Sequence, residues 1–322
     1  TGASPRSIPG IEVDGEVIHT SRTILEYKRL PQKMLIIGAG AIGVEFAYLF
    51  HALGTQITLV EMMDHILPVE DEDISRELEK IFKKQGMLIM TAAKVHNLRQ
   101  TGKVVSASIE TSQGEEKWSG DCCLLAAGVV PNSAGIGLEK AGIVSEKGFI
   151  KTDTLMATNQ PHHFAIGDVA GAPLLAHKAT HSGIIAAEAA CGLKPHPLCL
   201  DNLPSCTYCQ PQVASVGRSE KALKAAGIKF RVGKLPFSAI GKAVAAGEPE
   251  GFIKALICEE SGEVLGLHII QAEATELIAA AALVRSHEGT AQSVIETVFP
   301  HPTLSESLLE ATALAAGRPL NF

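Results

Sequence analysis

One stretch of sequence, residues 34–61, constrains the fold of this 322-residue chain more than any other. It opens with the wholly apolar run 34–37, which is typical of a buried parallel strand. A glycine-rich turn at 38–43 follows at once, and then an apolar segment, 44–53, that ends at a glycine as helices commonly do. A second apolar run at 57–60 predicts another strand. Together these elements predict a β-α-β unit and a Rossmann-type α/β fold.

The turn has the spacing G-x-G-x-x-G, and an acidic residue ends the next strand. We expect Gly38 to allow the tight turn, Gly40 to let the backbone approach a pyrophosphate, and Gly43 to permit close packing of helix on strand. The pyrophosphate would lie at the helix N-terminus, which favours negative charge. Glu61, 18 residues after Gly43, can accept hydrogen bonds from a ribose 2′-hydroxyl but would repel a 2′-phosphate. No Lys or Arg lies between Glu61 and Arg76, so NAD is favoured over NADP. The alternative is a turn used only for packing.

The elements predicted after residue 61 first continue the α/β pattern and then include antiparallel strands. Residues 71–85 predict a surface helix with acids in its first turn, and 87–90 and 122–126 predict further parallel strands. Between them, 94–118 predicts an antiparallel meander appended to the sheet. Farther along, we expect a strand at 164–166, a small-residue helix at 181–190 and a linker at 194–197. The last part predicts strands at 213–216, 252–258 and 264–270, and helices at 274–285 and 305–316.

Composition excludes several classes of protein. The net charge of −7 and the pI near 6.0 argue against a nucleic-acid partner, which would need a concentrated basic surface. No apolar run is long enough to span a membrane, and no signal segment opens the chain. Seven thinly spread cysteines indicate a reducing, cytoplasmic compartment. The length predicts about two domains.

Two further motifs are candidates for function. Asp168 follows the predicted strand 164–166, where α/β folds bind ligands, although a Gly-Asp pair is also a common turn. Two prolines flank His301 and restrict its backbone, and Glu306 is near enough to orient a general base. Thr303 and Glu306 also have the spacing of a helix capping box, and the sequence leaves both interpretations open.

Other cysteines and histidines favour structural roles. Cys206 and Cys209 form a C-x-x-C pair, but it does not open a helix after a strand, and no second pair completes a zinc site. Adjacent Cys122 and Cys123 are expected to be small buried hydrophobic residues. The His-His pair at 162–163 is expected to be a solvated loop, so no metal site is predicted.

Taken in chain order, six motifs resemble the FAD-dependent pyridine nucleotide–disulfide oxidoreductases, and most closely the branch that oxidises dihydrolipoamide. The match runs over essentially the whole chain, and the Ala-His-Lys-Ala segment together with His-Pro-Thr-Leu-Ser-Glu is specific for the branch that acts on lipoamide. The motifs are Thr1-Gly2-Ala3-Ser4, the glycine-rich turn, Gly128-x-x-Pro131-Asn132, Ala165-Ile166-Gly167-Asp168-Val169, Leu175-Ala176-His177-Lys178-Ala179 and His301-Pro-Thr-Leu-Ser-Glu306.

The resemblance implies an α/β fold in four parts: the end of an FAD-binding segment (1–23), a Rossmann-type NAD-binding domain (24–128), a second FAD-contacting central segment (129–198) and an α+β dimerisation domain (199–322). It implies that electrons pass from protein-bound dihydrolipoamide to a redox disulfide, then to FAD, then to NAD⁺. The implied partners are a second copy of the chain, bound through the last domain, and the lipoyl-bearing protein of a 2-oxoacid dehydrogenase or glycine cleavage complex.

The implied site residues follow from the matching motifs. His301 would be the acid–base for the dithiol, lent to the partner subunit's active site, and Glu306 would orient it. NAD would contact Gly38, Ala39, Gly40, Ala41, Ile42, Gly43, Val44, Glu45, Glu61, Val95 and Gly128. FAD would contact Thr1, Gly2, Ala3, Asp168, Leu174, Leu175, Ala176 and His177, with Asp168 on its ribityl chain.

The chain departs from the family in one large respect. It has a single G-x-G-x-x-G and no Cys-x4-Cys pair, whereas the family has an FAD fingerprint and a redox disulfide near its beginning. With an opening Thr1 in place of Met, we expect a chain that lacks this N-terminal segment. Such a chain would bind NAD, would not retain FAD and would be inactive alone. The alternatives are a non-catalytic NAD-binding dimerisation module and another flavin disulfide reductase of the family.

Overall fold

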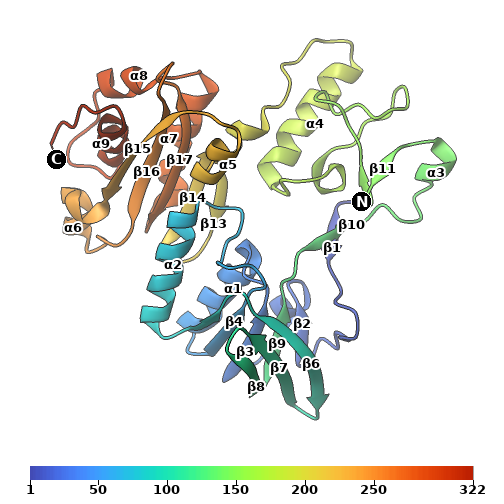
Figure 1. The fold of residues 1–322 in the computed structure, drawn as a ribbon. Helices are drawn as coiled ribbons and strands as arrows, with labels where there is room; N and C mark the ends of the chain where they lie inside the picture. Colours follow the sequence, from blue (N-terminus) through green and yellow to red (C-terminus); the bar gives the residue numbers. More distant parts are fainter. Residues whose placement is uncertain (322) are drawn as a thin grey trace. The chain divides into compact units, whose positions relative to one another are not determined.

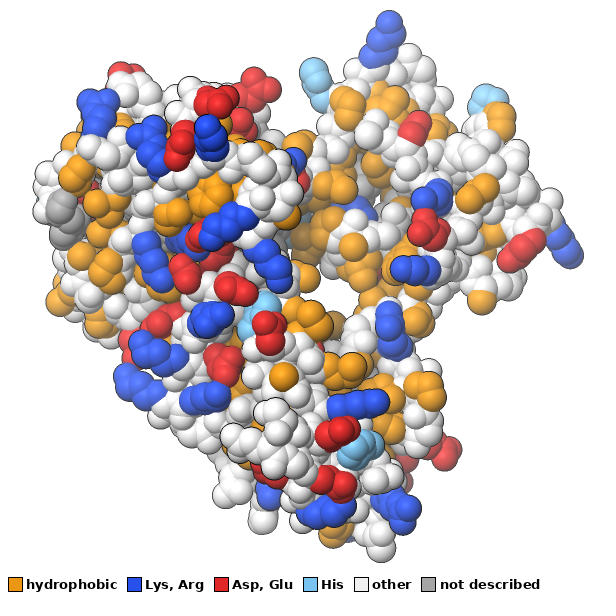
Figure 2. Space-filling view, viewed as in Figure 1, with side chains coloured by type: hydrophobic (Ala, Val, Ile, Leu, Met, Phe, Trp, Pro, Cys, Tyr) orange, Lys and Arg blue, Asp and Glu red, His pale blue; other side chains and the backbone are white. Residues whose placement is uncertain are grey.

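The computed structural model describes residues 1–321, which form two compact units (Figure 1). We call residues 1–6 and 128–203 the central unit, and residues 7–127 with 204–321 the larger unit. No helix in the described part of the chain is long and apolar enough to cross a membrane. On the face shown in Figure 2, basic and acidic side chains are interspersed.

The larger unit contains a five-stranded, all-parallel sheet built on the predicted β-α-β unit. Its first helices are α1 (Ala41–Ala52) and α2 (Glu72–Gln85). Residues 7–23, predicted with the FAD-binding segment, belong to this unit and supply an edge strand. In spatial order the strands are β2 (Ile18–Thr20), β9 (Cys122–Leu125), β3 (Lys33–Ile37), β4 (Gln56–Val60) and β5 (Leu88–Met90).

Both faces of this sheet are covered, which explains why β3 is apolar at every position after Lys33. Met34 and Ile36 pack with the helices in one core, whereas Leu35 packs in a second core with the antiparallel meander. The meander forms a separate three-stranded sheet, and its Trp118 donates a buried hydrogen bond (3.0 Å) to Thr58 on β4. Its strands are β6 (Lys94–Thr101), β7 (Val104–Thr111) and β8 (Gly114–Gly120).

A five-stranded antiparallel sheet forms the rest of the larger unit. Helix α7 (Ala274–Ser286) packs on β14 and β17, and α9 (Glu306–Ala315) packs on β15 and β16. In spatial order the strands are β13 (Ser205–Thr207), β14 (Gln212–Gly217), β17 (Val264–Gln271), β16 (Phe252–Cys258) and β15 (Phe230–Pro236). The shorter helices are η1 (Thr23–Glu26), α5 (Glu220–Ala225), η4 (Phe237–Ala239), α6 (Gly241–Ala246) and α8 (Ala291–Glu296).

The central unit is built from two strand ribbons and one long helix, α4 (Ala176–Ala190). The ribbons pair β1 (Ala3–Pro5) with β10 (Val129–Pro131), and β11 (Ser145–Glu146) with β12 (Phe149–Ile150). The short helices are α3 (Leu138–Ala141), η2 (Gly167–Ala170) and η3 (Leu200–Asn202).

The predicted strand at 164–166 is wrong. Phe164 makes only an isolated bridge to Ala157, and Ile166 is extended (φ −133°, ψ 165°) but unpaired within residues 1–321. A strand needs a neighbouring strand to satisfy its backbone groups, and the chain here turns into η2 instead. Asp168 therefore lies in a 3₁₀ turn. The helix predicted at 181–190 begins earlier, at Ala176.

Candidate nucleotide and acid–base sites

The glycine-rich turn of the larger unit has the backbone that its sequence predicts. Gly38 has φ +103°, and a Cβ there would lie 2.5 Å from the carbonyl oxygen of Ala126. A Cβ on Gly43 would lie 1.9 Å from the carbonyl oxygen of Gly38, so this position packs helix α1 directly on the turn. A Cβ on Gly40 would meet no protein atom within 4 Å. Protein packing thus requires glycine at Gly38 and Gly43, and does not explain it at Gly40.

The carboxylate of Glu61 lies against this turn. Its Oε2 accepts a hydrogen bond from the Ala39 N–H (2.7 Å), and its Oε1 accepts one from the Met63 N–H (2.9 Å). The carbonyl oxygen of Ala39 accepts a hydrogen bond from the N–H of Leu67 (2.8 Å). Ala39 is therefore held on both sides by the loop that follows β4.

These features suit a dinucleotide. Gly40 is the N-cap of α1 and makes no side-chain capping bond, so the first N–H groups of the helix are available to an anion. Ala41 is exposed and Ile42 half-buried at this end of the helix. Val44 is fully buried in the core, so only its backbone could face a ligand. The residues present therefore match an NAD pyrophosphate and ribose.

Glu45, on the next turn of α1, already has a protein partner. Its carboxylate accepts a hydrogen bond from the Tyr208 N–H (2.9 Å). Burial raises the pKa of Glu45, and this hydrogen bond partly offsets the rise. Val95 is half-buried at the start of β6 and packs against the meander core. Gly128 (φ +89°) belongs to the central unit, where its carbonyl oxygen accepts from the Arg6 N–H (3.0 Å).

In the central unit, the turn that bears Asp168 packs on the first turns of α4. Lys178, only 4% exposed, donates a hydrogen bond from Nζ to the carbonyl oxygen of Gly171. Burial lowers the pKa of Lys178, and the nearby carboxylate of Asp168 opposes this change. Leu174 and Leu175 are half-buried, and Ala176 and His177 are exposed at the start of α4. The structure thus brings the 167–171 turn and the 174–178 segment together.

The first residues of the chain are tied to the segment after Gly128. Asn132 donates from Nδ2 to the carbonyl oxygen of Thr1 (3.0 Å), and its N–H donates to the carbonyl oxygen of Gly2 (2.9 Å). Ala3 pairs with Pro131 in the β1–β10 ribbon. Two motifs separated by more than 120 residues therefore form one local structure.

His301 and Glu306 form a direct pair in the larger unit. His301 Nδ1 lies 2.8 Å from Glu306 Oε1, and the Thr303 N–H donates to Glu306 Oε2 (2.8 Å). The His301 side chain is 80% exposed, whereas that of Glu306 is 24% exposed. Partial burial raises the pKa of Glu306, but the Thr303 N–H and His301 more than offset it, so this pKa lies below its ordinary value. Ionised Glu306 therefore favours a proton on Nδ1 and leaves Nε2 to accept one.

The capping-box interpretation of this segment is only half realised. Glu306 does accept from the Thr303 N–H, but the Thr303 hydroxyl donates to the carbonyl oxygen of Pro300 (2.8 Å). Helix α9 begins at Glu306, and its N-cap, Ser305, makes no side-chain capping bond. The Glu306 carboxylate therefore accepts a hydrogen bond from the Thr303 N–H before helix α9 and also contacts the His301 imidazole.

The cysteines favour structural roles. Burial raises the pKa of Cys206 to about 11 and also raises the pKa of Cys209, so neither is a reactive thiolate near neutral pH. Cys209 donates from Sγ to the carbonyl oxygen of Pro211 (3.1 Å). Cys122 and Cys123 are fully buried on β9. All seven cysteines are free thiols.

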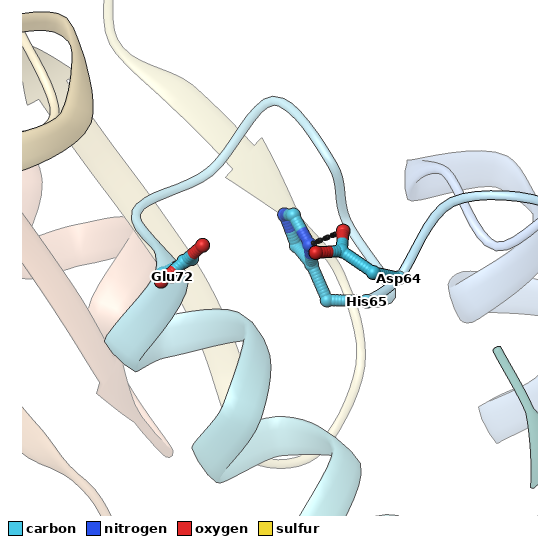
Figure 3. Close-up of side chains that lie close together, drawn as sticks. All are labelled: Asp64, His65 and Glu72. Carbon is cyan, nitrogen blue, oxygen red and sulfur yellow. Dashed lines mark hydrogen bonds and ion pairs between the residues drawn. The ribbon is translucent and has the colours of Figure 1, made fainter. Parts of the chain in front are cut away.

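One group of metal-ligating side chains lies together at the start of α2. Atoms of Asp64, His65 and Glu72 lie within 4.8 Å of one another (Figure 3). His65 Nδ1 pairs with Asp64 Oδ1 (2.6 Å), and Glu72 pairs with Arg76 (3.5 Å). These side chains are therefore already engaged, His65 with Asp64 by a hydrogen bond and Glu72 with Arg76 by an ion pair.

With this geometry in view, comparison with known proteins identifies the class. The family model described as "Pyridine nucleotide-disulphide oxidoreductase" matches residues 1–183, and the model of its dimerisation domain matches residues 203–312. The chain belongs to this family, which depends on FAD and NAD, and the resemblance drawn from the motifs is confirmed. The mixed α/β fold is confirmed too, and the dimerisation domain indicates a homodimer.

Individual relatives narrow the class. A dihydrolipoyl dehydrogenase of Zymomonas mobilis is 44% identical over 326 residues, a match that covers 100% of this chain and 70% of the relative. A dihydrolipoyl dehydrogenase of Bacillus subtilis is 41% identical over 324 residues, covering 100% of the chain and 68% of the relative. The crystal structure of LpdA from Mycobacterium tuberculosis superposes with a TM-score of 0.90 at 30% identity, covering 98% of this chain and 68% of that one.

Two buried lysines, Lys178 and Lys254, are not predicted from the sequence. Lys178 lies in the Leu175–Ala179 motif, directly after the residues that are expected to contact FAD. Lys254 lies in the middle of the apolar strand 252–258 and is 1% exposed. A lone lysine inside a run of core residues is itself a signal, because a buried ammonium needs carboxylate partners.

Proposed function

We propose that these residues form the NAD-binding, central and dimerisation parts of a dihydrolipoyl dehydrogenase, which oxidises protein-bound dihydrolipoamide and reduces NAD⁺. The observation that carries this proposal is the pair of an exposed His301 and a carboxylate, Glu306, that fixes its tautomer. A module that only bound NAD would have no use for this pair.

The pair explains how a dithiol proton is moved. His301 Nε2 accepts the proton of the incoming thiol, and the thiolate that results is the nucleophile. The charge that forms on the imidazole is stabilised by Glu306, which accepts the hydrogen bond from Nδ1. Such acid–base assistance is worth about 10²–10⁴ in rate. Because His301 is exposed in the isolated chain, we propose that it serves the active site of the partner subunit.

The nucleotide turn orients NAD for its part of the reaction. The N–H groups at the start of α1 bind the pyrophosphate, and Glu61 binds the ribose and disfavours a 2′-phosphate. Bound FAD would supply a two-electron carrier, and bound NAD⁺ would supply the final hydride acceptor. We propose that Asp168, the 174–177 segment and Thr1–Ala3 hold FAD in the intact enzyme, and that the four-part division at 23, 128 and 198 describes its domains.

These 322 residues alone are expected to bind NAD but not to oxidise dihydrolipoamide. None of the seven cysteines is paired in a Cys-x4-Cys motif, so no disulfide of that kind accepts electrons from the dithiol. FAD retention by this chain is not expected. A lipoyl-bearing protein as the partner, and a cytoplasmic location, remain part of the proposal.

The proposal is tested by replacing His301. The chain would be fused to the part of the Zymomonas mobilis relative that it does not cover, and the fusion assayed with dihydrolipoamide and with an NADH-driven dye. His301→Gln should lower dithiol oxidation by about 10²–10⁴ and spare dye reduction, because only the dithiol step needs the base. His287→Gln, at another exposed histidine of the same unit, is the control and should change neither. Equal loss of both activities in His301→Gln would refute the assignment.

A further inference from the structure

A buried ion-pair cluster joins the two halves of the larger unit. Lys254, in the middle of β16, donates hydrogen bonds from Nζ to Asp71 Oδ1 (2.8 Å), Asp73 Oδ2 (3.0 Å) and Glu220 Oε2 (2.7 Å). The side chains of Lys254 and Asp71 are each 1% exposed. Asp71 and Asp73 come from the start of α2 in the first half, whereas Lys254 on β16 and Glu220 at the start of α5 come from the second half.

The charges of this cluster balance. Lys234 pairs with Asp73 (3.3 Å) and Lys224 pairs with Glu220, so three ammonium groups face three carboxylates. His268, paired with Lys254 across β16 and β17, is fully buried, and burial lowers its pKa and keeps it neutral. Removing one buried charge from such a set leaves its partners unpaired in a medium that solvates them poorly.

Within this cluster, Asp71 also binds backbone N–H groups. It is the N-cap of α2 and accepts from the Asp73 N–H (3.2 Å), and its Oδ2 accepts from the Glu220 N–H (3.0 Å). The loop that leaves β4 at Glu61 therefore ends in a residue fixed to the other half of the unit.

The same loop frames the nucleotide turn. At one end Glu61 accepts from the Ala39 N–H, and in the middle the Leu67 N–H donates to the Ala39 carbonyl oxygen. Leu67 is in turn held from α2, because the Ser75 hydroxyl donates to its carbonyl oxygen (3.2 Å). Leu67 is also 1% exposed. A continuous set of contacts runs from Lys254 through Asp71 to both sides of Ala39.

We propose that Lys254 is a positioning residue for NAD: by holding Asp71 it fixes loop 61–71, and through Leu67 and Glu61 it fixes the turn 38–43 that receives the dinucleotide. This inference rests on the proposed NAD site. It assigns to the sheet of the dimerisation region an influence on nucleotide affinity that is transmitted through loop 61–71.

The test measures NADH binding by the full chain. Trp118, the single tryptophan, is hydrogen-bonded to β4 of the nucleotide sheet, and its fluorescence would be the energy-transfer donor to bound NADH. Lys254→Met should raise the dissociation constant for NADH roughly tenfold. Asp71→Asn is the milder change, because it keeps an N-cap acceptor and leaves Lys254 paired with Asp73 and Glu220. It should weaken NADH binding roughly threefold. Lys234→Met removes the exposed cation that pairs with Asp73, and its dissociation constant for NADH should stay within about twofold of the wild-type value.

Hydrogen exchange separates positioning from a general loss of stability. In Lys254→Met, peptides covering 61–70 should exchange faster, while those of the meander, 94–111, should keep the wild-type rate. Faster exchange in both regions, or a wild-type NADH affinity in folded Lys254→Met, would overturn the inference. Should Lys254→Met not fold, a wild-type affinity in Asp71→Asn would overturn it instead. Failure of the wild-type chain to bind NADH would refute the NAD site itself, and with it this inference.

Discussion

Two glycines of the nucleotide turn are required for different reasons. A Cβ at Gly43 would lie 1.9 Å from backbone, whereas a Cβ at Gly40 would meet no protein atom and the backbone there (φ −68°) suits any residue. Gly43→Ala should therefore destabilise the protein by about 1–3 kcal/mol or more through overpacking. Gly40→Ala should cost less than about 1 kcal/mol, the loss of a good N-cap, and yet weaken NADH binding.

Urea unfolding and NADH titration of both variants check this pair of predictions. Gly43→Ala should lower the free energy of unfolding. Gly40→Ala should instead weaken NADH binding. A Gly40→Ala chain that binds NADH as tightly as the wild type would show that Gly40 is not where the pyrophosphate approaches.

At the scale of single residues, the sequence predicts local chemistry and misses distant pairing. Gly38 and Glu61 lie within one β-α-β unit, so their spacing alone indicates their roles. His301 and Glu306 are five residues apart and are likewise predictable. The partners of Lys254 are 34 to 183 residues away along the chain, and their local sequence pattern does not predict the contact.

At the scale of elements, one glycine sets how closely α9 approaches the sheet. A Cβ at Gly233 on β15 would lie 2.0 Å from the carbonyl oxygen of Ala311 in α9. Helix α9 begins at Glu306, so this contact also supports the acid–base pair. Gly233→Ala should destabilise the protein by about 1–3 kcal/mol, because relieving the clash would require the backbone of β15 or of α9 to move.

The control for this prediction is Gly241→Ala, at the start of α6. A Cβ there would meet nothing within 4 Å, and helix propensity favours alanine by up to about 1 kcal/mol. Thermal unfolding of the two variants should therefore move in opposite directions. Equal stability of Gly233→Ala and the wild type would mean that α9 does not pack on β15 as the structure has it.

Elements were predictable where pattern and length were both strong. The strands around 34–37, 252–258 and 264–270 were found because they are apolar on both faces. Strand β15 was missed because Gly233 interrupts its alternation, and β13 because three residues are too few to show a period. Helix α2 has the exposed polar face expected of a surface helix, but the sequence does not reveal that its N-cap, Asp71, is buried against the other half of the unit, where it meets Lys254.

At the scale of the whole molecule, a second buried acid lies where the two halves of the larger unit meet. Glu70 is 7% exposed, and its Oε2 has no hydrogen-bond partner among residues 1–321. Burial raises its pKa above the ordinary 4.5, although the hydroxyls of Ser215 and Ser205 partly favour the charged form. The adjacent Asp71 favours the neutral form, and Cys206 also lies near.

This buried carboxyl should make stability fall as the pH rises. Above about pH 4.5 the unfolded chain has released the Glu70 proton while the folded chain still holds it, so the free energy of unfolding decreases until the folded pKa is passed. Residue 70 does not titrate in Glu70→Gln, so the free energy of unfolding of this variant relative to the wild type should grow between pH 4.5 and pH 8. The ion pairs of Lys254 titrate in both proteins and cancel in the difference. Urea unfolding at the two pH values measures the difference in free energy of unfolding between variant and wild type. Glu116→Gln, at an exposed glutamate, is the control, and its difference from the wild type should not grow with pH. A difference that is flat or shrinks with pH would mean that Glu70 ionises at its ordinary pKa in the folded protein.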